Sequence, residues 1–223
     1  MELPYNEYVW FSPRFAINYL WDLMKKDGTE KVLKNSNYKR AREAWIMGIA
    51  LFGYMKLSNA KWWLQVPQDD PPDIRAMTMV PDYVKNLHEM HHREVEIMQI
   101  TKHTKGTIID EILKKLAGKS YIKETALLVY LQRTMFIEDI RKLAEDISKA
   151  KPKVADIWIL ASTAPDRQVY ILFSLYPQIQ RVDFDVDEEV QKLEPGDSLN
   201  LIPRRKGTTM KLVKNVRRTK FIH

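Results

Sequence analysis

The chain is predicted to fold as an α/β protein in which a mixed β-sheet is flanked by helices. Three observations support this prediction. Strand-like and helix-like patterns alternate after an opening of three strands. Residues 125–131 (TALLVYL) form a continuous apolar run of strand length, which is typical of a central strand covered on both faces. Amphipathic helical patterns lie on either side of this run, and they would supply that cover.

Composition is that of one packed domain. The 223 residues are 45% hydrophobic and include six Trp and ten Tyr, which excludes a disordered chain. There are no cysteines, so a disulfide framework and thiol metal sites are excluded. A net charge of +7 favours a polyanionic partner such as nucleic acid or an acidic membrane, with simple solubility as the alternative.

The sequence predicts a soluble, cytoplasmic protein with no membrane partner. The start MELPYNEYVW lacks a basic region followed by an apolar one, so no signal peptide is expected. The longest apolar run, residues 44–55, is too short to span a bilayer. The absence of cysteine fits the same compartment.

Residues 1–37 are predicted to form an N-terminal helical segment. Ser12 is a suitable helix cap and Pro13 suits the first helical position, and Gly28 ends the pattern. A second helix is predicted over residues 38–55.

The second helix has an apolar face that includes Trp45 and Phe52. Its small residues Gly48 and Gly53 would let it lie close to a neighbour. Its helical propensity is mediocre, so tertiary packing has to stabilise it.

Three strands are predicted next. Aromatic and branched residues indicate a strand at residues 61–66, and Pro67 and Pro71 place a loop after it. Alternating patterns predict strands at residues 73–80 and 93–101. Residues 81–92 between them fit either a helix or a long hairpin connection.

Residues 38–194 are predicted to form the main α/β domain. Its elements after residue 101 are two helices and four strands. Thr107 caps a clear helix, and Gly118 ends it. The other predicted elements are the strand at 125–131, a helix from Thr134 that ends before Pro152, a hairpin of strands at 157–161 and 169–175, and an edge strand at 182–186.

Residues 195–223 are predicted to be a basic C-terminal extension. No acidic residue follows Asp197, so the charge of this segment is entirely positive. Such a segment suits contacts with phosphates. The basic residues assigned to nucleic-acid binding are Arg204, Arg205, Lys206, Lys211, Lys214, Arg217 and Arg218.

This order of elements, with Pro72-Asp73 at the second strand and an acidic third strand before a helix, resembles the PD-(D/E)xK nuclease superfamily. The resemblance covers residues 38–186 and implies the restriction-endonuclease-like fold. It also implies cleavage of phosphodiester bonds in DNA, with Mg²⁺ as the cofactor and Mn²⁺ as a substitute. Because two cuts on a duplex need two sites, self-association as a homodimer or a larger assembly is expected.

The resemblance also implies a set of site residues. Asp73 matches the aspartate of the motif and would hold the metal together with Glu96. The glutamate-lysine element falls either at Glu94-Val95-Glu96, an E-x-E variant, or at Glu96-Ile97-Met98, where methionine replaces lysine. The additional candidates are Gln99 and Lys102 near the end of this strand and Glu43 as an accessory acid. A solvated strand face is the alternative interpretation of the two glutamates.

Two further motifs have alternative interpretations. His88-Glu89-Met90-His91-His92 matches the H-E-x-x-H pattern of zinc hydrolases, but a solvated hairpin loop is favoured because strand periodicity begins at Arg93. The pair Trp62-Trp63 suits stacking on bases, although packing in a core is favoured. The functional hypotheses are a DNA endonuclease, a non-catalytic nucleic-acid-binding or scaffold protein of the same fold, and, more remotely, a zinc hydrolase.

Overall fold

A computed structural model describes residues 8–68, 72–83, 87–117, 121, 125–132, 139–164, 168–193, 198–203 and 210–213. Ten strands of this part of the chain form one mixed sheet. They are β1 (Val9–Phe11), β2 (Trp62–Gln65), β3 (Ile74–Asp82), β4 (Leu87–Ile100), β5 (Ala126–Leu131), β6 (Asp156–Ala164), β7 (Val169–Tyr176), β8 (Gln180–Asp185), β9 (Ser198–Pro203) and β10 (Met210–Val213). Their spatial order is β10-β9-β1-β2-β3-β4-β5-β6-β7-β8.

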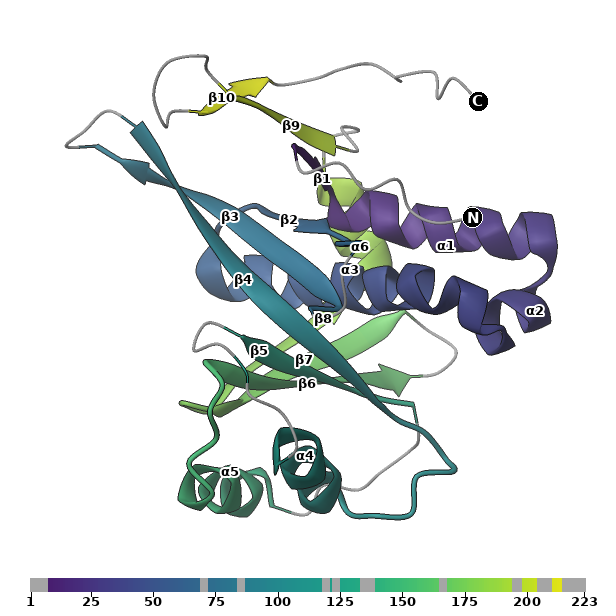
Figure 1. Ribbon diagram of the computed structural model, residues 1–223, viewed down its shortest axis with the longest axis vertical. Helices are drawn as coiled ribbons and strands as arrows, with labels where there is room; N and C mark the ends of the chain where they lie inside the picture. The colour runs from purple at the N-terminus through teal and green to yellow at the C-terminus, as the bar shows by residue number, and fades with distance from the viewer. Residues whose placement is uncertain are drawn as a thin grey trace.

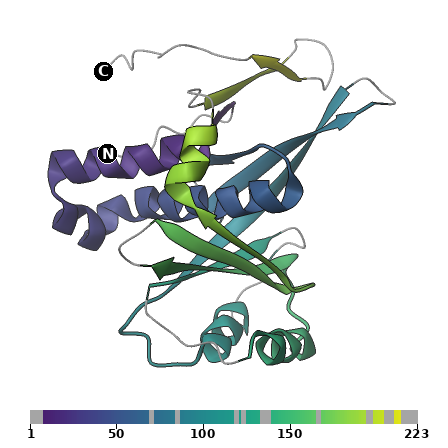
Figure 2. The same cartoon turned by 180° about the vertical axis from the view of Figure 1, so that it is seen from behind.

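Helices cover both faces of the sheet (Figure 1). They are α1 (Pro13–Asp27), α2 (Thr29–Lys34), a 3-10 turn η1 (Ser36–Tyr38), α3 (Lys39–Ser58), α4 (Ile108–Ala117), α5 (Ile140–Lys149) and α6 (Val186–Lys192). One group, α1 to α3 with α6, lies on one side, and α4 and α5 lie together on the other (Figures 1 and 2). The predicted α/β class with a mixed, helix-flanked sheet is confirmed.

The direction of pairing explains this arrangement. The pairs β4–β5 and β5–β6 are parallel, and the remaining neighbours are antiparallel. A parallel pair needs a crossover connection, and α4 and α5 lie within the two crossovers. The continuous apolar sequence of β5 is therefore buried on both faces, as the sequence predicted.

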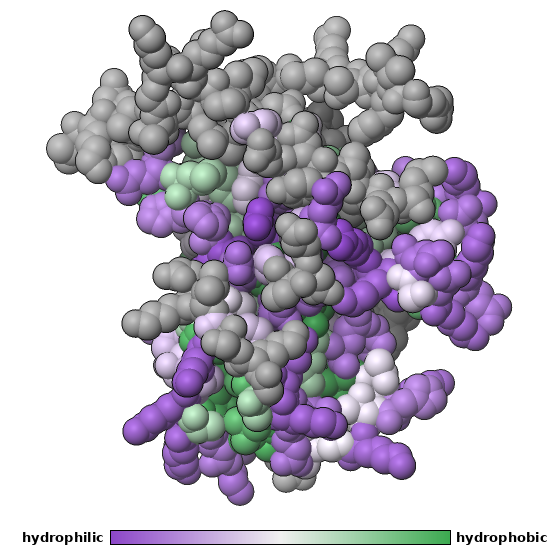
Figure 3. Space-filling model, viewed as in Figure 1, coloured by the Kyte–Doolittle hydropathy of each residue, from purple (hydrophilic) through white to green (hydrophobic). Residues whose placement is uncertain are grey.

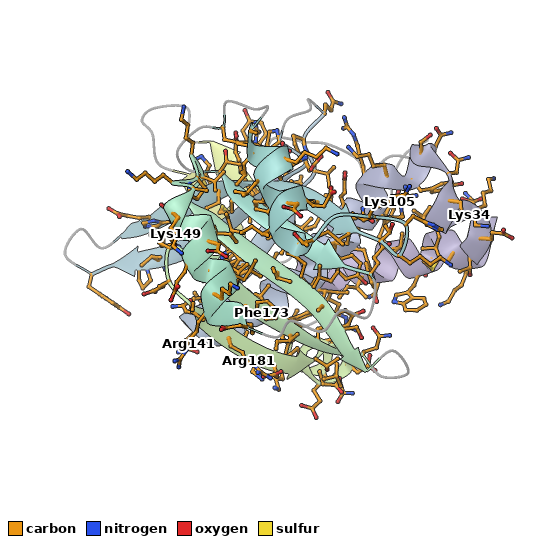
Figure 4. All side chains as sticks on the ribbon, turned by 90° about the horizontal axis from the view of Figure 1, so that it is seen from below. Lys34, Lys105, Arg141, Lys149, Phe173 and Arg181 are labelled. Atoms are coloured by element: carbon orange, nitrogen blue, oxygen red, sulfur yellow. The ribbon has the colours of Figure 1, made fainter. Side chains whose placement is uncertain are left out.

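Two apolar clusters fill the space between the sheet and its two helical layers. The first joins α1 and α3 to the sheet through residues such as Phe52, Val95 and Leu128. The second joins α4 and α5 to the opposite face, and it includes Ile147 of α5 and Phe173 of β7, which is labelled beside α5 in Figure 4. In Figure 3 hydrophilic residues dominate the right and lower edges of the coloured surface, and hydrophobic residues show mainly in its lower centre.

Most of the described residues between the second and third predicted strands belong to β3 and β4. Every residue of β3 pairs with β4, from Ile74 opposite Val95 to Asp82 opposite Leu87. The alternative of a helix over residues 81–92 is therefore wrong. The placement of the histidines in a hairpin loop is also wrong, because His88, His91 and His92 lie within β4.

Several elements differ from the sequence prediction. The prediction lacked β1, α2, α6, β9 and β10. The first of these has three residues and α2 has six residues with no side-chain cap, so neither gives a periodic signal. The predicted helix start at Thr134 lies outside the described residues, and α5 begins after Asp139, whose carboxylate accepts from the backbone of Arg141 and Lys142.

The terminal segments share the sheet and the core with the middle of the chain. Strand β9, from the segment predicted to be an extension, pairs with β1, and β1 pairs with β2. Helix α1 packs on α3, with Ala16 and Ile17 in the same cluster as Met47. No helix in the described ranges is both long enough and apolar enough to cross a bilayer.

Small residues set the distance between α3 and its neighbours, as expected from the sequence. A Cβ added to Gly48 would lie 3.0 Å from the carbonyl oxygen of Pro13 and 3.2 Å from Ala16 Cβ. A Cβ added to Gly53 would lie 2.7 Å from Cδ2 and 2.9 Å from Cβ of Leu172. The helix therefore touches α1 on one side and β7 on the other with no room for a methyl group.

We expect Gly53→Ala to lower the free energy of unfolding by about 1–2 kcal/mol. Overpacking a filled core costs about 1–3 kcal/mol, and the better helix propensity of alanine offsets part of this cost. Urea denaturation measures the change, with Leu57→Ala on the exposed side of the same helix as the control. An unchanged or more stable Gly53→Ala protein would contradict the close approach of α3 to β7.

Candidate functional site

Asp73 lies where β3 begins and is held by the backbone of β4. Pairing between the two strands stops at Ile74 and Val95, while β4 continues to Ile100. Beyond that point Asp73 Oδ2 accepts a hydrogen bond from the backbone nitrogen of Ile97 at 2.8 Å. The Asp73 side chain is only 6% exposed. Its carboxylate therefore continues the pairing of the two strands and has a fixed position one residue from Glu96.

Lys39 connects Asp73 to Glu43 at the start of α3. The Lys39 Nζ atom lies 3.5 Å from Asp73 Oδ1 and 3.4 Å from Glu43 Oε1. Glu43 is buried, whereas the Lys39 side chain is 52% exposed. Lys39 and Glu43 are one helical turn apart and so share a face of α3. The expected accessory acid therefore lies near Asp73, with an ammonium group between the two carboxylates.

Glu96 lies on β4 and turns toward α4. Its strand neighbours Val95 and Ile97 belong to the cluster under α3, and Met98 belongs to the cluster under α4. Since side chains alternate along a strand, Glu96 shares the α4 side with Met98. Its side chain is 2% exposed, and Oε2 lies 3.1 Å from the Nζ atom of Lys115 on α4.

Lys115 and Lys39 are the two site residues that the sequence reasoning missed. The motif predicts a lysine on the strand of Glu96, whereas both ammonium groups come from helices. The Lys115 side chain is 26% exposed, so it is reachable from solvent while it pairs with a buried carboxylate. The only sequence signal was a basic residue in the last turn of the helix that follows the acidic strand.

The other predicted site residues have separate surroundings. Glu94 is half-buried and lies opposite Arg75 in the strand register. The Gln99 side-chain oxygen accepts from Gln132 Nε2 at 2.9 Å. Lys102 is exposed in the turn after β4. Met98, at the lysine position of the second motif frame, is buried in the apolar cluster under α4.

The predicted basic contacts of the C-terminal segment fall mostly outside the described residues. Lys211 lies on β10, where the structure gives the backbone path only. The others, namely Arg204, Arg205, Lys206, Lys214, Arg217 and Arg218, are outside the described ranges.

The strand geometry removes the basis for a zinc site at the histidines. The H-E-x-x-H pattern needs His88 and His92 one helical turn apart. On the extended strand β4 the same spacing places their Cα atoms about 13 Å apart. His91 lies between them and, like them, is exposed. Among the described residues, no group of three or more His, Asp or Glu side chains is arranged to hold a metal ion.

The donor chemistry of Asp73 and Glu96 nevertheless suits Mg²⁺. This ion prefers hard oxygen ligands, and proteins that act on phosphates often hold it with one or two carboxylates, waters and phosphate oxygens. Both carboxylates are fixed by the fold, and their backbones are adjacent through the bond from Ile97 to Asp73. Binding would require the ammonium of Lys39, 3.5 Å from Asp73, to move aside.

The candidate site thus consists of two groups of charged residues beside the junction of β3 and β4: Asp73, Lys39 and Glu43 at α3, and Glu96 and Lys115 on the α4 side of the sheet. It can hold cations at its carboxylates and donate hydrogen bonds to anions from its lysines. Comparison of the chain with family models, with curated proteins and with solved structures found no match, so the site rests on its own geometry.

Proposed function

We propose that this protein has the restriction-endonuclease-like fold and hydrolyses phosphodiester bonds of DNA with the help of Mg²⁺ or Mn²⁺. The observation that carries the proposal is the hydrogen bond from Ile97 to Asp73, which fixes a buried aspartate beside the strand of Glu96. The order of α3, the antiparallel strands β2 to β4, the crossover helix α4 and the parallel strand β5 supports it.

The proposal assigns a role to each charged residue. Asp73 and Glu96 would hold the metal ion, which when bound supplies Lewis acidity and a more acidic water. Lys115, beside Glu96, would supply from α4 the ammonium group that the strand lacks at Met98. A lysine has three N–H donors, so it can contact a carboxylate and still donate to a phosphate oxygen or a water. Glu43 would hold Lys39 close to Asp73.

The experiment that tests the proposal is a cleavage assay with the full chain. Supercoiled plasmid, linear duplex and single-stranded DNA, with RNA for comparison, are incubated with Mg²⁺, with Mn²⁺ or with EDTA. We expect nicked or linear products with either metal and none with EDTA, because the carboxylates need the ion to act on a phosphate. The absence of cleavage of every substrate with both metals would overturn the proposal.

One observation favours a second candidate, a nucleic-acid-binding or scaffold protein that keeps the fold without the chemistry. The ammonium of Lys39 lies between Glu43 and Asp73, so the chain itself supplies a cation at the site. The net charge of +7 would still attract nucleic acid. Binding of DNA in EDTA, with no cleavage after metal is added, identifies this second function.

A further inference from the structure

A cavity of about 410 Å³ lies away from the carboxylate site, on the sheet formed by β2, β3 and β4. Its lining residues are Trp62, Thr78, Met90, His91, His92 and Arg93. The long hairpin of β3 and β4 extends past the C-terminal end of α3 (Figure 2). The strand register places Trp62, Thr78 and His91 side by side across the three strands.

One wall of this cavity is an aromatic ring held in a fixed position. Trp62 Nε1 donates a hydrogen bond to Ser58 Oγ at 3.0 Å, at the end of α3. The same indole packs against Tyr54 with 5.8 Å between ring centroids. Beside it, buried Thr78 donates from Oγ1 to the carbonyl oxygen of Lys61 at 2.8 Å. The half-buried indole is therefore preorganised to receive a planar group.

The opposite wall carries cationic and imidazole groups. The Arg93 Nη1 atom pairs with the mostly buried carboxylate of Asp156, which anchors the guanidinium at the cavity. Burial raises the pKa of Tyr54 far above its usual range, and the nearby charge of Arg93 acts in the opposite direction. His91 is exposed at the rim on the same face of the sheet as Trp62 and Thr78, and His91 Nε2 lies 3.8 Å from Glu89 Oε2. An arginine with an adjacent imidazole is suited to a phosphate group.

We infer that this cavity binds one unpaired nucleotide of a nucleic-acid strand, with the base against Trp62 and the phosphate near Arg93 and His91. A ring that accepts a planar group and a neighbouring cation together match a nucleotide, whereas an acidic peptide would use the cations and leave the ring unused. The cavity is also within the usual size of a small-molecule site.

This inference rests on the proposed action on nucleic acid and specifies its substrate class. A base in a duplex is stacked on its neighbours and has no free face for Trp62. The cavity therefore selects substrates with a single-stranded segment, a frayed end or a displaced base. The carboxylate site would act on the backbone of such a strand, and the cavity would hold the strand independently of any metal.

Binding measured in EDTA tests the inference without cleavage. Fluorescence anisotropy gives the affinity of the full chain for a labelled single-stranded oligodeoxyadenylate and for an abasic oligonucleotide of the same length. We expect Trp62→Ala to weaken binding of the adenylate by about 5- to 150-fold, because the base loses its stacking on an aromatic side chain. Trp62→Phe keeps a ring and should retain most of the affinity.

The abasic strand and a matched variant make the result specific. Wild type should bind the abasic strand more weakly than the adenylate, and Trp62→Ala should bind both about equally, since the base has lost its partner. Trp21→Ala removes a tryptophan that is 45% exposed on α1 and should change nothing. Equal affinity of wild type for the two strands, or full affinity in a folded Trp62→Ala protein, would overturn the inference.

The outcome is separable from that of the proposed function. Base-dependent binding without cleavage would reject the nuclease and keep the cavity as a nucleotide site. Cleavage that is indifferent to Trp62 and to unpaired bases would keep the nuclease and reject the cavity. If Trp62→Ala fails to fold, the wild-type comparison of the two strands decides alone.

Discussion

Replacing Asp73 by asparagine is expected to slow the proposed DNA cleavage by at least about 100-fold while the protein stays folded. The asparagine side-chain oxygen can still accept the hydrogen bond from Ile97, so the junction of β3 and β4 is kept. The lost negative charge weakens the hold on a divalent cation, and a loss of about 2.7 kcal/mol in transition-state stabilisation corresponds to 100-fold. Single-turnover cleavage of the best substrate measures the effect.

The control for this variant is Asp22→Asn, which makes the same chemical change at an exposed aspartate on α1. Its cleavage rate should equal that of wild type. Asp73→Ala adds a second measurement, because it also leaves the backbone nitrogen of Ile97 unsatisfied. That loss should lower stability by about 1–3 kcal/mol beyond the effect of asparagine. Near-normal cleavage by folded Asp73→Asn would mean that Asp73 has a structural role only.

Replacing Lys115 by methionine is expected to lower the free energy of unfolding by about 3 kcal/mol. The change removes an ammonium group 3.1 Å from the Glu96 carboxylate, which is almost fully buried. Removing one partner of a buried ion pair typically costs about 3–5 kcal/mol, and the partial exposure of Lys115 places the expectation at the lower end. Chemical denaturation at neutral pH measures the change.

The double variant Glu96→Leu with Lys115→Met provides the matching control. Apolar replacement of both partners is often neutral or stabilising, so we expect most of the lost stability to return. Restored stability combined with a complete loss of cleavage would indicate that the pair is retained for its chemistry. A Lys115→Met protein within about 0.5 kcal/mol of wild type, the range usual for surface substitutions, would contradict the buried pair.

The elements that could be predicted from the sequence are those with a strong local pattern. Ser12 caps α1 through the backbone nitrogen of Phe15, and the apolar run of β5 is a buried strand, as expected. The polar half of β4 was missed because residues with no apolar alternation give no strand signal, and pairing with β3 supplies the stability instead. Strand β1 and helix α2 gave no signal because three and six residues are too few to show a period.

The candidate site could be predicted only in part. Glu43, Asp73 and Glu96 were predicted as site residues, and the structure buries all three side chains. Their lysine partners could not be read from spacing, because Lys39 precedes Asp73 by 34 residues and meets it only after α3 packs on the sheet. Lys115 likewise meets Glu96 only after α4 packs on the sheet, so the sequence of β4 alone does not indicate this partner.

The hydrogen bond between Asp73 and Ile97 would affect which residues change in related proteins that have lost an activity. A residue that secures two strands remains under selection even after an enzyme has lost its reaction. The aspartate would therefore persist in inactive copies, where it would be a misleading marker of catalysis. Lys115 is needed instead as the partner of the buried Glu96, so the two residues could be replaced together by apolar ones without a loss of stability. Retention of Glu96 and Lys115 together would therefore be a more informative sign of activity than retention of Asp73.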